Sequence, residues 1–201
     1  APPEAVEGWI GYHLAVGFAA LHLYFDDPLD EGLPAAEAYA HRGVVVVRCT
    51  ASFWEEQRRE NAFFHAAGAH LRHRSGLTPA SFERGDVQSR QCVAVQHAVG
   101  VAAAAGSDWL LHADIDELWY SPHPACQRDA PAAFASAPDD VGELLFHNHE
   151  AVPPHRDVPC WFSDITRFKL SSFFCRSRAA NARREAWGNA ARAERSACDD
   201  A

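Results

Sequence analysis

Four consecutive valines at positions 44–47 constrain the fold of this chain more than any other stretch. An uninterrupted β-branched run favours a strand, and the lack of polar alternation predicts burial on both faces of a parallel sheet. Residues 21–25 predict a second strand. Helices are predicted over 4–18, from the spacing of apolar residues, and over 35–42. Helices and strands therefore alternate, which is the pattern of an α/β fold.

The middle of the chain continues this alternation. Asp86 is predicted to cap a helix that runs toward Gly106, which ends it. Residues 109–113 are then predicted to form a strand that ends in carboxylates. Open α/β sheets bind ligands at this edge. Residues 144–149 and 165–170 are further strand candidates.

Three carboxylates, Asp114, Asp116 and Glu117, follow the predicted strand. In an extended segment the side chains of residues two apart point to the same face, so Asp114 and Asp116 are predicted to share a divalent cation. Hard oxygen ligands favour Mg²⁺ or Mn²⁺, shared with a ligand phosphate. For an isolated Asp-x-Asp, the commoner alternative is a solvated acidic turn.

A second acidic pair, Asp26 and Asp27, closes the strand predicted at 21–25. Two acidic strand ends in one α/β sheet are typical of nucleotide-sugar sites, where one contacts the nucleoside and the other holds the metal on the diphosphate. The alternative for this pair is an Asx-type turn before Pro28. Both interpretations stay open at the level of the residues.

Composition sets the outer limits. The 201 residues carry a net charge of -9, which argues against a nucleic-acid partner. No apolar run reaches the roughly 18–20 residues of a membrane span. Because the chain contains no Met and begins with Ala1, we expect a processed chain or a fragment, with any anchor outside it. The six cysteines include no Cys-x-x-Cys pair and permit either disulfides or isolated thiols.

Several motifs in combination resemble those of one enzyme group. They are WIGYH at 9–13, LYFDDP at 23–28, Gln91 within a helix, DWLLHADIDEL at 108–118, HNHEAVP at 147–153 and TRFK at 166–169. Together they resemble the GT-A glycosyltransferases, and within these the family 92 or glycosyltransferase family 2-like group. The resemblance covers roughly residues 7 to 169.

The resemblance implies a twisted, mostly parallel GT-A sheet flanked by helices, and metal-dependent transfer of a hexose-type sugar. The donor is a nucleotide-sugar, expected to be a UDP-sugar, and the acceptor is a glycan, a lipid or a protein. By resemblance Asp114 and Asp116 hold Mn²⁺ or Mg²⁺, Asp26 or Asp27 contacts the nucleoside, and Gln91 lies near the donor pocket. Inverting chemistry and a Golgi or other secretory-pathway membrane, on the lumenal side, are further expectations.

An inverting transferase needs a base that deprotonates the acceptor hydroxyl. The candidates after the acidic motif are Glu150 and Asp164, and for each the alternative is an ordinary surface carboxylate. His147, His149 and His155 lie near Glu150 and have spacing that suits Zn²⁺. A strand-face or loop role for these histidines is the alternative.

We expect residues 1–175 to form the catalytic domain, without the first strand of the GT-A fold, and 176–201 to form a helical or disordered tail. Two rival functions remain. One is an inactive glycan-binding or scaffold remnant of the same fold. The other is a metal-dependent phosphohydrolase of the haloacid dehalogenase type, which needs its Asp-x-Asp on an early strand; here the motif comes late and is followed by Glu117.

Overall fold

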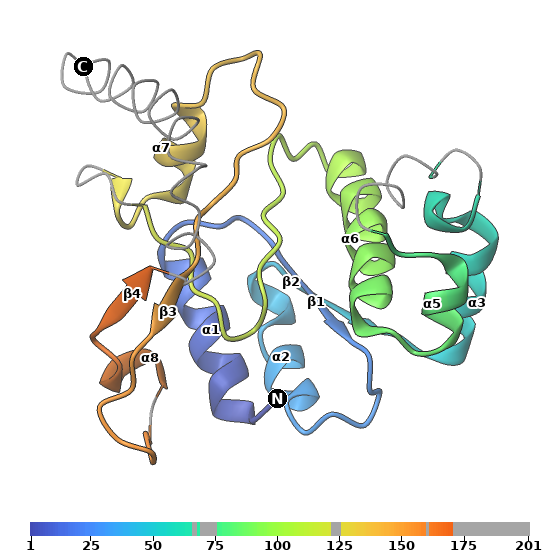
Figure 1. The fold of residues 1–201 in the computed structure, drawn as a ribbon. Coiled ribbons are helices and arrows are strands. Elements are labelled where there is room, and N and C mark those ends of the chain that lie inside the picture. Colours follow the sequence, from blue (N-terminus) through green and yellow to red (C-terminus); the bar gives the residue numbers. More distant parts are fainter. Residues whose placement is uncertain (66–67, 69–75, 122–125, 160, 171–201) are drawn as a thin grey trace. The chain divides into compact units, whose positions relative to one another are not determined.

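The structure is a computed structural model that describes residues 1–65, 68, 76–121, 126–159 and 161–170 (Figure 1). The chain divides into two compact units, a first unit of Ala1–Asp139 and a second unit of Asp140–Ala201, each of which is described by itself. The predicted boundary between residues 175 and 176, and the predicted tail, lie outside the described residues.

The first unit holds most of the regular structure. Its α-helices are α1 (Pro3–Ala15), α2 (Leu33–Glu37), α3 (Ala51–Glu60), α5 (Pro79–Glu83), α6 (Val87–Ala104) and α7 (Ala130–Ala135). Its 3₁₀ helices are η1 (Ala40–Arg42) and η2 (Ala62–Phe64), and its strands are β1 (Leu21–Phe25) and β2 (Val44–Arg48). Among the described residues, no helix is both long and apolar enough to span a bilayer.

Strands β1 and β2 form a parallel pair in which Leu21 lies opposite Val44 and Phe25 lies opposite Arg48. Both predicted strands are confirmed. The predicted burial of the valine run on both faces is wrong, because Val44 is buried while Val45 is 41% exposed. In the described part of the chain this sheet has two strands, so β2 is an edge strand.

This small parallel sheet with its helices is compatible with the predicted α/β class, whereas the larger twisted sheet of the GT-A fold stays a prediction.

The helix predicted over 35–42 is shorter than expected, because α2 ends at Glu37 and η1 follows. The turn before β2 is made by Gly43, whose φ of +83° favours glycine. A Cβ there would lie 2.8 Å from the carbonyl oxygen of Ala19.

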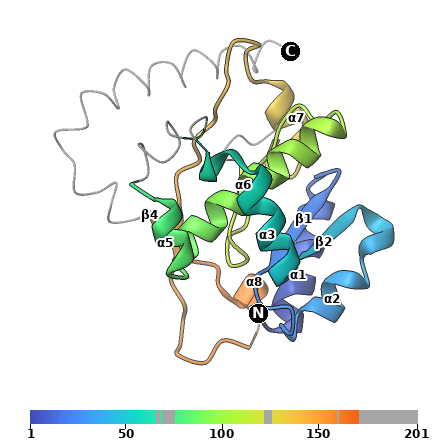
Figure 2. The same cartoon turned by 90° about the vertical axis from the view of Figure 1, so that its right-hand side faces the viewer.

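Helix α6 is the longest element of the first unit and follows its predicted bounds closely. The Asp86 carboxylate accepts a hydrogen bond of 2.8 Å from the Ser89 amide and caps the helix as expected. Gly106, at a φ of +77°, follows the helix end. Figures 1 and 2 show α3, α5 and α6 grouped together. Phe82 of α5 and Val93 of α6 form a buried hydrophobic cluster with Phe63 of η2.

The second unit holds a short antiparallel pair, β3 (His149–Ala151) and β4 (Phe168–Leu170), and helix α8 (Trp161–Asp164). The strands predicted over 144–149 and 165–170 are therefore only partly confirmed. Residues 144–148 form no strand, because a strand needs a neighbour for its backbone groups and only His149 of the predicted segment pairs with β4.

The hydrophobic cluster generates the first prediction. Phe63 is 1% exposed, so Phe63→Ala removes a buried ring and leaves a cavity, and we expect a loss of about 3–5 kcal/mol in the free energy of unfolding. Urea unfolding measures this loss. Val87→Ala, at a position that is 66% exposed, is the control and should change the free energy little. Equal effects of the two substitutions would contradict the burial of Phe63 in this cluster.

Candidate functional site

The acidic motif forms a turn, which we call the acidic turn and define as residues 114–117. The Glu117 amide donates to the Asp114 carbonyl at 3.0 Å, and the Asp114 amide donates to the Glu117 carboxylate at the same distance. The strand predicted over 109–113 is wrong, since these residues form no regular structure and Leu110 is 37% exposed. A short apolar run does not by itself distinguish a strand from an irregular segment.

The acidic turn is attached to helix α1 through the indole of Trp9. Trp9 Nε1 donates to the carbonyl oxygens of Asp114 at 3.1 Å and of Glu117 at 2.8 Å. Trp9 is 9% exposed, and a buried indole N–H needs such partners. In Figure 1 the yellow-green segment after α6 turns back beside α1, in agreement with these contacts.

Two more residues of α1 hold the chain just after the acidic turn. Tyr12 donates its hydroxyl to the Trp119 carbonyl at 2.7 Å, and His13 Nε2 accepts from the Trp119 amide at 3.3 Å. Trp9, Tyr12 and His13 are spaced i, i+3, i+4 and thus share one helix face. The WIGYH motif contains all three, but sequence reasoning assigned them no role; their common face was the available signal.

The hydrogen bonds of His13 specify a neutral ring. Its Nδ1 lies 2.9 Å from the Trp9 carbonyl, which only accepts, so Nδ1 carries the proton and Nε2 is left to accept from Trp119. Burial lowers the pKa of His13, and the hydrogen bond to the Trp9 carbonyl opposes this only in part. A second proton, on Nε2, would point at the N–H of Trp119, so the hydrogen bond between Trp119 and His13 requires the neutral ring.

Helix α6 contacts two of the predicted site carboxylates from neighbouring positions. Gln91 Nε2 donates to Asp114 Oδ1 at 3.0 Å, and Arg90 forms an ion pair of 2.6 Å with Asp26. The structure therefore brings Asp26 and Asp114 into contact with neighbouring residues near the start of α6, while a donor pocket at Gln91 stays a prediction. Sequence reasoning missed Arg90, although it directly precedes Gln91 in the chain.

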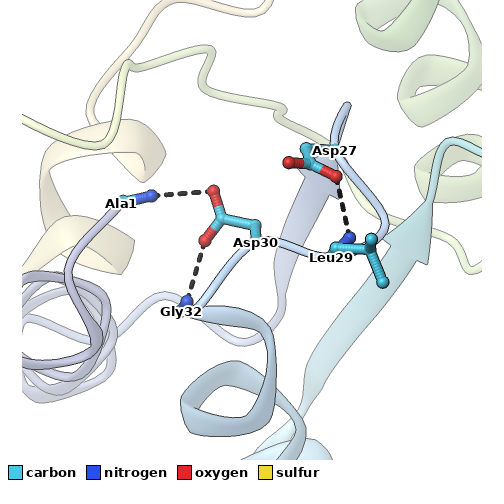
Figure 3. Close-up of polar contacts among 5 residues, drawn as sticks. All are labelled: Ala1, Asp27, Leu29, Asp30 and Gly32. Atoms are coloured by element: carbon cyan, nitrogen blue, oxygen red, sulfur yellow. Dashed lines mark hydrogen bonds and ion pairs between the residues drawn. The ribbon is translucent and has the colours of Figure 1, made fainter.

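The other member of the first acidic pair, Asp27, makes a local turn. Its Oδ1 accepts from the Leu29 amide at 2.9 Å, which is the Asx-type alternative (Figure 3). Asp30 nearby accepts from the Gly32 amide and pairs with the Ala1 ammonium (Figure 3). Of the two residues of the pair, Asp26 is thus the one that faces α6.

Tyr24 attaches α6 to β1, close to these contacts. Its hydroxyl lies 2.8 Å from His97 Nδ1, and burial raises the pKa of Tyr24, so the phenol stays neutral. Burial, followed by the negative charge of Asp26, raises the pKa of the nearby Cys49 thiol to about 12. Cys49 is therefore a protonated, unreactive thiol at neutral pH.

The carboxylates of the acidic turn fit the oxygen chemistry of Mg²⁺ or Mn²⁺, and Asp114 and Asp116 are both exposed. No group of three or more His, Cys, Asp or Glu side chains that could hold a metal occurs in the described residues. One or two carboxylates are, however, the usual protein share when Mg²⁺ also binds substrate phosphates. Asp114 and Asp116 would be those ligands.

The two candidate bases lie in the second unit. Glu150, in β3, forms an ion pair of 3.0 Å with Lys169 on the facing strand, and Asp164, in α8, accepts from the Ser163 hydroxyl. These contacts lie within the second unit and do not test a role as base, which stays a prediction for both residues. His147 precedes β3 and His149 belongs to it, so the two histidines do not lie on one strand.

Two known proteins are similar to this chain, both from Arabidopsis thaliana and both named glycosyltransferase-like. One is 26% identical over 163 residues, which is 80% of this chain and 34% of that protein. The other is 22% identical over 161 residues, or 80% of this chain and 30% of that protein. The chain thus spans about a third of the length of these relatives. No protein-family model and no solved structure matches it.

The indole contacts generate a prediction about the acidic turn. Trp9→Phe keeps a ring in place but removes the donor that both turn carbonyls share, and we expect a loss of about 1–3 kcal/mol in the free energy of unfolding. Amide hydrogen exchange at Glu117 should also become faster. Trp161→Phe, at a 48% exposed position, is the control. Unchanged exchange at Glu117 would contradict a holding role for Trp9.

The buried ring of His13 generates a pH prediction. The pKa of His13 in the folded state lies below the ordinary 6.5. At pH values between these two pKa values, the unfolded chain therefore binds more protons at this position than the folded chain does. This contribution to stability is fully present above pH 6.5 and is lost as the pH falls toward the folded-state pKa. NMR titration of the His13 ring should give a midpoint below that of a histidine peptide. A midpoint at or above the peptide value would refute it.

Proposed function

We propose that this chain carries the donor-binding part of a glycosyltransferase, an enzyme that moves a sugar from a nucleotide-sugar to a glycan, lipid or protein acceptor. The similarity to two glycosyltransferase-like proteins supports the general class. The observation that carries the proposal is the pair of contacts at the start of α6. There Arg90 pairs with Asp26 and Gln91 bonds Asp114, which brings two acidic segments of the chain to one place.

In this proposal Asp114 and Asp116 hold Mn²⁺ or Mg²⁺, and Asp26 contacts the nucleoside of a UDP-sugar. The metal, when bound, neutralises charge on the leaving diphosphate. Gln91 fixes the orientation of the Asp114 carboxylate through its 3.0 Å hydrogen bond. Glu117 shapes the turn, because its carboxylate already accepts from the Asp114 amide.

Helix α1 contributes positioning to this proposed site. The backbone carbonyls of Asp114 and Glu117 are fixed by Trp9, so the exposed side chains of the acidic turn start from a held backbone. Such pre-positioning lowers the conformational-entropy cost of ligand binding, because less of the site has to become ordered when the ligand binds. The position of the acidic turn is thus set by side chains of α1 and α6.

The remaining steps of the proposed reaction rest on the resemblance. Inversion needs a base, and Glu150 and Asp164 are the candidates that we carry forward. The Lys169 ammonium holds the Glu150 carboxylate in its ion pair, so Glu150 would have to leave this partner to accept a proton. Residence in the lumen of the Golgi or another secretory-pathway membrane belongs to the same proposal.

The proposal predicts metal-dependent donor binding. UDP-sugars should raise the melting temperature of the protein in Mn²⁺, and should do so much less in the double variant Asp114→Asn/Asp116→Asn. The reason is that the metal's protein ligands are then lost. Glu56→Gln, at an exposed position on α3, removes one carboxylate elsewhere and should leave the stabilisation unchanged.

Other outcomes would point to the rival functions. Stabilisation by a glycan but by no UDP-sugar, at any Mn²⁺ concentration, would replace the transferase with a glycan-binding remnant. Release of inorganic phosphate from simple phosphoesters, abolished in the double variant, would instead favour the phosphohydrolase. Donor stabilisation that persists in the double variant would refute the proposed metal ligands.

A further inference from the structure

We infer that Arg90 binds the diphosphate of the donor and that it exchanges the Asp26 carboxylate for phosphate when the donor binds. This inference rests on the proposed function and adds a cation to the site. It concerns binding alone, and the motifs that suggested the function did not include Arg90.

The charge of the site is the first reason. Asp26, Asp114 and Asp116 are acidic, while a diphosphate is itself an anion, so its binding requires positive charge on the protein as well as a metal. Within the described residues of the first unit, Arg90 is the basic side chain in contact with one of these carboxylates. It therefore sits where the missing positive charge is needed.

The present partner of Arg90 is readily replaced. The Arg90 and Asp26 side chains are 36% and 50% exposed, and ion pairs in contact with water contribute little to stability. A phosphate carries more charge than a carboxylate and accepts two parallel hydrogen bonds from a guanidinium. The exchange of Asp26 for a phosphate group is therefore favourable.

The guanidinium is also held in place and incompletely satisfied. Its carbon lies 5.9 Å from the centre of the Trp54 ring, a cation–π distance that restrains the side chain. Arg90 Nε is buried and has no hydrogen-bond partner in the described residues. A buried donor without a partner is unfavourable, and a move of the guanidinium from Asp26 to a phosphate would let Nε gain one.

The position of Arg90 joins the two predicted halves of the donor site. The α-carbons of Arg90 and Gln91 are about 3.8 Å apart, as in any trans peptide. One side chain reaches Asp26 and the other reaches Asp114. A donor whose nucleoside contacts Asp26 and whose metal lies on Asp114 therefore has its diphosphate near Arg90. Release of Arg90 from Asp26 at the same time frees that carboxylate for the ribose.

The test compares Arg90→Gln, Arg90→Lys and wild-type protein by calorimetric titration with UDP in Mn²⁺, with uridine, and with inorganic diphosphate without metal. We expect Arg90→Gln to weaken binding of UDP and diphosphate about tenfold to a hundredfold, the usual size of a lost charge-assisted hydrogen bond, and not to weaken binding of uridine. Arg90→Lys should fall in between, because lysine keeps the charge but not the planar fork.

Two controls separate phosphate binding from a structural role. Arg84→Gln removes an exposed charge nearby and should not change the binding of any ligand. The uridine titration is the second control. If Arg90→Gln weakens uridine and UDP equally, Arg90 serves only the fold and the inference is overturned.

The remaining outcomes distinguish the inference from the proposed function. Equal UDP binding by wild type and Arg90→Gln overturns the inference and leaves the transferase standing. Arg90-dependent binding of diphosphate without any response to UDP-sugars supports the anion site and overturns the transferase. Wild-type protein that binds neither UDP nor diphosphate overturns both.

Discussion

The hydrogen bonds from the Trp9 indole to two backbone carbonyls are the contacts on which the candidate site depends. No strand ladder holds the acidic turn, because residues 109–113 adopt no regular structure. Its backbone is held instead by one buried N–H that serves both Asp114 and Glu117. The neutral ring of His13 extends the same attachment to Trp119. The acidic turn is thus fixed by side chains of a helix more than a hundred residues away.

Helix α6 completes the site from the other side. Its first turn reaches the end of β1 and the acidic turn through Arg90 and Gln91. Further along, His97 bonds the Tyr24 hydroxyl and attaches the helix to β1. Because one helix contacts both acidic segments, it fixes their positions relative to each other. The proposed donor site and the role proposed for Arg90 both rest on these two contacts.

Local signals in the sequence predicted helix α6 and strands β1 and β2. Helix α6 was predicted within a few residues from the cap at Asp86 and the glycine at Gly106. Strands β1 and β2 were predicted because β-branched and aromatic residues favour the extended conformation, a preference that can be recognised in a short segment. The strand at 109–113 was not a correct prediction, since its formation depends on a neighbouring strand and no local pattern supplies one.

Local patterns in the sequence were enough to single out the residues that we propose for the site, namely the carboxylates of Asp26, Asp114, Asp116 and Glu117 and the amide of Gln91. How these residues meet became apparent only in the packed fold. It placed Asp27 in a local turn, paired Asp26 with Arg90 and attached the acidic turn to α1. The physical reason is range. Caps and strand propensities act over a few residues, whereas these contacts join segments far apart in the chain and exist only after packing.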